Sequence, residues 1–137
     1  MTTSTISATG TFRPKSWDEA PWAEDEQGHK LTHAKVTYDY SGDIEGECTS
    51  QALMWYPEES RATFAGFERV VGRLADRSGS FVLEARGTFE NGAATTTWAV
   101  VPGSGTGGLT GLRGTGGYVA GSGESDVRYW LDYAFES

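Results

Sequence analysis

Three carboxylates interrupt otherwise apolar and aromatic stretches of this chain and are the residues best suited to acid–base chemistry. Glu45 and Glu47 lie in the segment 44–56, and Glu68 lies in the segment 61–74. A carboxyl group that leaves water for an apolar interior has a raised pKa and can act as a general acid or base near neutral pH. On the outer surface the same groups are ordinary solvated charges. Glu47 and Glu68 are the candidate catalytic residues.

The cysteine and the two histidines predict less chemistry. Cys48 has no histidine close to it in the sequence, and a thiol needs a basic partner to act as a nucleophile, so we expect a small buried side chain. His29 and His33 are four residues apart, a spacing that brings two imidazoles together on a helix. Here they flank the start of a predicted strand and lack a third ligand, so we predict no metal site.

Alternation of apolar and polar residues with a period of two predicts an all-β fold. Between Leu31 and Tyr40, one face carries Ala34, Val36 and Tyr38, and the other face is mostly polar. Further strands are predicted over 6–17, 44–56, 61–74, 81–90, 93–102, 118–120 and 127–135, with an acidic loop over 18–28 and turns over 57–60 and 76–79. No helix longer than a single turn is expected.

The dipeptide Asn91-Gly92 predicts a two-residue hairpin turn of type I′, because these residues accept the two positive φ angles that the turn needs. Such a turn fixes the register of its strands, placing Leu83 opposite Val100 and Ala85 opposite Trp98. That face is apolar and combines the large Trp98 ring with small neighbours. We therefore expect Trp98 to lie in the core.

The glycine-rich segment 103–117 predicts an irregular connection that turns a corner on a curved sheet. Gly103, Gly105 and Gly108 match the spacing of a dinucleotide-binding fingerprint, but that fingerprint requires a helix directly after it. Further glycines, among them Gly111 and Gly114, interrupt any such helix. The segment is therefore not interpreted as a nucleotide site.

About eight antiparallel strands in 137 residues predict a single domain, 1–137, that forms a small antiparallel eight-stranded barrel. Closure removes exposed strand edges, and the interior of such a barrel is filled by side chains or holds one small ligand. The formal net charge of −8 disfavours nucleic acid and membrane partners. One cysteine, no apolar run of membrane-spanning length and no signal peptide predict a cytoplasmic protein.

Three ordered motifs, at 40–47, 77–83 and 101–114, together with the closing Leu131-Asp132-Tyr133, carry a resemblance over nearly the whole chain. The chain resembles an uncharacterised bacterial family, a domain of unknown function with an allene-oxide-cyclase-like, calycin-like β-barrel. More distantly it resembles allene oxide cyclases and dirigent proteins. This resemblance implies an eight-stranded barrel that acts on apolar molecules without a cofactor and assembles as a homo-oligomer, a dimer or trimer.

The expected ligand contacts are Tyr38, Cys48, Trp55, Trp98 and Tyr133. On the segment 44–56, alternation places Glu47 and Trp55 on one face and Cys48 on the other, and either face can point inward. Trp17 and Trp22 flank the acidic loop and form either a lid or a plug. Three functions follow: binding of a small apolar or aromatic metabolite, a cofactor-independent cyclase or isomerase with a buried carboxylate, and an oligomeric interaction domain with a filled barrel.

Overall fold

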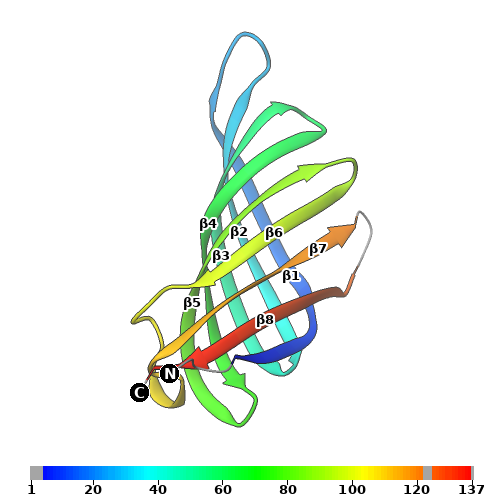
Figure 1. Cartoon of the computed structure of the whole chain (residues 1–137). Helices are drawn as coiled ribbons and strands as arrows, with labels where there is room; N and C mark the ends of the chain where they lie inside the picture. The colour runs from blue at the N-terminus through cyan, green and yellow to red at the C-terminus, as the bar shows by residue number, and fades with distance from the viewer. Residues whose placement is uncertain (1–4, 122–124, 137) are drawn as a thin grey trace.

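Eight antiparallel strands form a closed barrel in which each strand pairs with its neighbours in sequence and the first pairs with the last (Figure 1). The computed structural model describes residues 5–121 and 125–136. The predicted all-β barrel is confirmed. Its elements are β1 (Ile6–Glu24), β2 (Lys30–Gly42), β3 (Ile44–Glu58), β4 (Arg61–Leu74), β5 (Arg77–Glu90), β6 (Ala93–Val100), the 3-10 turn η1 (Gly107–Leu109), β7 (Leu112–Gly121) and β8 (Val127–Phe135).

The hairpin between β5 and β6 has the predicted turn and register. Asn91 and Gly92 have φ angles of 53° and 77°, as a type I′ turn requires. Leu83 pairs with Val100 and Ala85 with Trp98. Because this register directs the Trp98 ring into the barrel, its side chain is buried, and the prediction that it lies in the core is confirmed.

Strand β1 is longer than predicted and replaces most of the expected acidic loop. It pairs with β8 only as far as Phe12, and from Arg13 to Glu24 it pairs with β2 alone. The β1–β2 hairpin therefore extends well beyond the rim of the barrel (Figure 1). Pro14 and Pro21 lie in this edge portion, next to the two register shifts of the pair. Edge strands tolerate proline because their free side needs no amide donor.

Strand β7 begins at Leu112, so the second half of the glycine-rich segment is strand and the prediction of a connection as far as residue 117 is wrong. The reason is a close approach between β7 and β8. A Cβ atom at Gly116 would lie 2.0 Å from the carbonyl oxygen of Trp130, so glycine here permits tight strand pairing. The connection proper contains the single turn η1, as expected.

The barrel is packed at one end. Its largest fully buried apolar side chains include Ile44, Val70, Leu74, Phe81, Leu83, Leu109, Leu112 and Leu131. Leu109 belongs to η1, which lies at the same end as the start of β1 and the end of β8, opposite the projecting β1–β2 hairpin (Figure 1). Within the described residues there is no helix long and apolar enough to cross a membrane.

Candidate functional site

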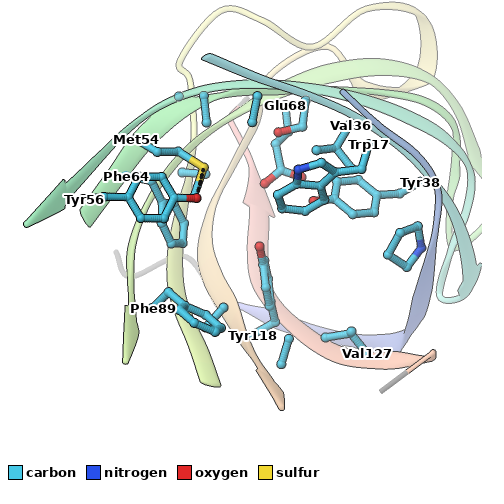
Figure 2. Close-up of a pocket in the computed structure, with 18 of the residues that line it drawn as sticks. Trp17, Val36, Tyr38, Met54, Tyr56, Phe64, Glu68, Phe89, Tyr118 and Val127 are labelled. Carbon is cyan, nitrogen blue, oxygen red and sulfur yellow. Dashed lines mark hydrogen bonds between the residues drawn. The ribbon is translucent and has the colours of Figure 1, made fainter. Parts of the chain in front are cut away.

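The other end of the barrel is hollow. A cavity of about 390 Å³ lies inside it, and all eight strands contribute to its wall. None of the largest fully buried apolar side chains of the packed end lines it. Figure 2 looks into this space, with side chains projecting inward from the surrounding strands. The larger side chains of the wall are Trp17, Val36, Tyr38, Met54, Tyr56, Phe64, Phe89, Tyr118 and Val127.

A row of small residues accounts for the hollow. Ala34 on β2 pairs with Ala52 on β3, Ala52 with Gly66 on β4, and Gly66 with Ala85 on β5. All four line the cavity. Because none carries a side chain beyond Cβ, four adjacent strands leave space at one level of the barrel. Sequence reasoning missed this row, which is visible only once the register aligns residues far apart in the chain.

Glu68 lies on β4 between Gly66 of the small-residue row and Val70 of the packed end, and so at the floor of the cavity. Strand β4 directs its side chain into the barrel (Figure 2). Its side chain is buried, with only 3% of the residue exposed. The Trp98 indole N–H donates to Oε2 at 3.2 Å, and the Cys48 thiol donates to Oε1 at 3.5 Å. Burial raises the pKa of Glu68 to about 7, and these donors only partly offset that rise. The carboxyl group therefore exchanges its proton near neutral pH.

The groups around Glu68 are neutral near pH 7. Burial raises the pKa of Cys48, Tyr38, Tyr40 and Tyr118, and the nearby Glu68 charge raises each further. The Tyr40 hydroxyl has no hydrogen-bond partner among the described residues, although it lies close enough to favour the charged form of Glu68. The Tyr118 hydroxyl points into the cavity from the opposite wall (Figure 2). No positive side chain is among these neighbours.

The rim of the cavity is held by a second carboxylate, Glu19 of β1. Its oxygens accept hydrogen bonds from the Tyr56 hydroxyl at 2.6 Å, the Thr32 hydroxyl at 2.7 Å and the Trp17 indole N–H at 3.0 Å. Partial burial raises the pKa of Glu19, but these hydrogen bonds and the Lys30 charge outweigh it, so the pKa lies below its usual value. The projecting β1–β2 hairpin thereby fixes Trp17 at the cavity.

Four of the seven predicted site residues lie together: Glu68 and three residues next to it. Tyr38 and Glu68 line the cavity itself. Cys48 and Trp98 do not line it, but both donate hydrogen bonds to the Glu68 carboxylate. Tyr133 is buried but does not line the cavity, and its ring packs against Phe135. Sequence reasoning did not name Tyr118, Phe64 and Phe89, which also line the cavity. Each belongs to the inward-facing set of alternate residues on its strand, and this alternation is the signal that could have identified them.

Two predicted site residues lie outside the barrel, and these predictions are corrected. Glu47 is solvent-exposed and forms an ion pair with Lys15 at 3.2 Å. Trp55 is 44% exposed and lies near His29 on the outer surface. The face of β3 that carries Cys48 points inward, so the alternate residues necessarily point outward. Trp17 lines the cavity, whereas Trp22 does not.

Within residues 5–121 and 125–136, no group of three or more His, Cys, Asp or Glu side chains is placed to hold a metal ion. His29 pairs with Asp25 at 2.8 Å, and His33 contacts Gln51 at 3.0 Å.

The fold and the cavity define this chain as a small closed β-barrel with a hollow half. The chain belongs to the family described as "Protein of unknown function (DUF3224)", which matches residues 8–133. It is similar to a crystal structure of a protein of unknown function from this family, from Shewanella oneidensis MR-1. The two share 28% sequence identity with a TM-score of 0.78, over 97% of this chain and 99% of the other.

No curated protein matches the chain. The family resemblance predicted from the sequence motifs is thus confirmed. The more distant resemblance to allene oxide cyclases and dirigent proteins is not tested by these matches and stays a prediction.

Proposed function

We propose that this barrel binds one small apolar or aromatic molecule in its internal cavity. The cavity carries the proposal: its volume of about 390 Å³ lies in the range of known small-molecule sites, which are largely apolar with a few polar groups. Its wall is mostly aromatic and aliphatic, and Glu68 and the Tyr118 hydroxyl are polar groups directed into it. The alternative of a filled barrel does not fit this hollow half.

Titration with a neutral apolar probe tests the proposal. We expect 2-naphthylmethanol to quench tryptophan fluorescence and to saturate at one molecule per chain, because Trp17 lines the cavity. The variant Ala52→Leu adds a side chain to the small-residue row and should abolish binding. Ala99→Leu adds the same group to the exposed face of β6 and should leave binding unchanged. Equal binding by both variants would place the probe elsewhere.

A cofactor-independent isomerase or cyclase is the second candidate, and Glu68 favours it. A carboxyl group with a pKa of about 7 at the floor of an apolar cavity is suited to take a proton from one carbon and return it to another. The aromatic ketone 2-tetralone tests this ability, since its α-protons exchange with D₂O through an enol. The wild-type protein should accelerate this exchange in NMR spectra and Glu68→Gln should not. Equal rates of exchange in the two proteins would refute the proton-transfer role of Glu68 and leave binding as the only proposed function.

A further inference from the structure

The charged side chains among the described residues that line the cavity are all acidic. The ionisable carboxyl groups along its wall are Glu68 at the floor and Glu59 in the turn between β3 and β4. Among the described residues that line the cavity, none is Lys, Arg or His. Lys30 lies over the ring of Tyr56, with its Nζ 4.8 Å from the ring centre, and does not itself line the cavity. A negatively charged ligand therefore finds no ion-pairing partner in the wall.

The Glu68 carboxylate receives fewer hydrogen bonds from its neighbours than it can accept, and no charge from them balances its own. Its two hydrogen-bond donors are the Trp98 indole and the Cys48 thiol, which are neutral. An ionised carboxylate can accept about four hydrogen bonds, so acceptor capacity remains. The titratable groups facing it are Cys48 on β3, Tyr38 and Tyr40 on β2, and Tyr118 on β7, and all four keep their protons at neutral pH.

Aromatic rings surround the space above this carboxylate. The electron-rich face of such a ring attracts a cation, and the attraction is stronger where water is excluded. Rings reach the cavity from β1, β2, β3, β4, β5 and β7, and they belong to Trp17, Tyr38, Tyr56, Phe64, Phe89 and Tyr118 (Figure 2). A ligand that combines an apolar body with one positive charge could pack its body against the aromatic wall and place its charge on the Glu68 carboxylate.

We infer that the cavity selects lipophilic amines, bound with the ammonium group on the Glu68 carboxylate and the apolar body against the aromatic wall. This inference rests on the proposed binding function. When Glu68 is protonated, the ammonium displaces its proton to solvent, so binding is coupled to proton release. The Glu68 pKa of about 7 sets the range in which this coupling operates.

Three probes of one shape test the inference by calorimetry: 2-naphthylmethylamine, 2-naphthylmethanol and 2-naphthoate. At pH 8 the amine should bind at least tenfold more tightly than the alcohol, and the carboxylate should bind most weakly. Lowering the pH to 6 should weaken the amine about tenfold, because Glu68 then holds a proton that must leave. Binding of the alcohol should change little. At pH 6, two buffers of different ionisation enthalpy should report release of about one proton.

Two variants localise the effect. Glu68→Gln removes the carboxylate while keeping its shape, and it should bring amine and alcohol to the same affinity. Glu47→Gln removes an equal charge from the outer surface and should retain the preference for the amine. Near-ultraviolet circular dichroism verifies that each variant is folded, and the pH dependence of the wild type stands independently of both.

The outcomes separate the two proposals. Equal binding of amine and alcohol, at one molecule per chain, would overturn the inference and leave the proposed binding function intact. The same result follows if 2-naphthoate binds most tightly, or if Glu68→Gln keeps the preference for the amine. Absence of binding by all three probes would overturn the binding function itself.

Discussion

Burial of Glu68 lowers the stability of the folded protein when its carboxyl group is ionised. It is buried, its hydrogen-bond donors are neutral, and no ion pair links it to a basic side chain of the described residues. Burying a carboxyl group without an opposite charge is costly, because its ionised form loses hydration that nothing replaces. A buried carboxyl with a strongly perturbed pKa beside a cavity is therefore better explained by function than by stability.

The free energy of unfolding should depend on pH because of Glu68. The unfolded chain ionises Glu68 near its ordinary pKa of 4.5 and the folded chain near 7, so the folded state holds the extra proton between these values. The contribution of Glu68 to stability is complete below pH 4.5 and is lost as the pH rises through 7. This loss amounts to about 3 kcal/mol.

Denaturant unfolding of the wild type and Glu68→Gln at pH 5 and pH 8 measures that loss. Glutamine does not titrate, so the variant should gain about 2–3 kcal/mol relative to the wild type over this interval. The comparison cancels the titration of other groups. A constant difference between the two proteins would show that the folded pKa of Glu68 is not raised.

Among single residues, sequence reasoning named Glu47 and Glu68 as candidates and could not show which of them points into the barrel. Both faces of β3 contain large apolar residues, Leu53 and Trp55 on one and Met54 and Tyr56 on the other. Alternation alone therefore does not show which face is buried. The pairing with β2 and β4 decides it, since Cys48 lies between Tyr38 and Val70.

Among the elements, those with a distinctive local signal were predicted best. Asn91-Gly92 defines its own turn chemistry, so the β5–β6 register followed from two residues. Composition misled where proline and glycine occur within strands. Pro21 lies in the edge portion of β1, and Gly116 lies where β7 approaches β8. Both residues usually mark loops, and only the strand pairing shows why they are accommodated here.

Gly116→Ala tests the close approach of β7 and β8. The added Cβ would meet the Trp130 carbonyl oxygen and the Leu131 Cα, so the strands must move apart. We expect a loss of about 1–3 kcal/mol, typical of overpacking. Thr115→Ala on the exposed face of the same strand should change stability by no more than about 0.5 kcal/mol. Both values come from urea unfolding, and equal stability of the two variants would contradict the pairing geometry.

The whole molecule exposes an apolar surface on the outside of the sheet. Leu53 and Phe67, each more than half exposed, line one shallow depression on β3 and β4, and Trp55 adjoins Leu53. The charged pair Glu84–Arg86 at its edge is balanced, although the chain carries a net charge of −8. Two copies can therefore meet here without the repulsion that the rest of the surface imposes.

The prediction of a homo-oligomer belongs to this scale. Light scattering coupled to size-exclusion chromatography should find a dimer or trimer, and the double variant Leu53→Lys, Phe67→Lys should be a monomer. Ile6→Lys changes an equally exposed apolar residue on β1 and should keep the wild-type mass. A monomeric wild type at all concentrations would refute the prediction.

The division of the barrel into a packed end and a hollow end has a consequence for protein engineering. The residues that shape the hollow, such as Ala34, Ala52 and Ala85, share no position with the large apolar side chains that fill the other end. Randomising the former leaves the latter, and the register that they maintain, untouched. Libraries built on the hollow end should therefore contain a high proportion of folded members, which makes this barrel a suitable scaffold for selecting new receptors.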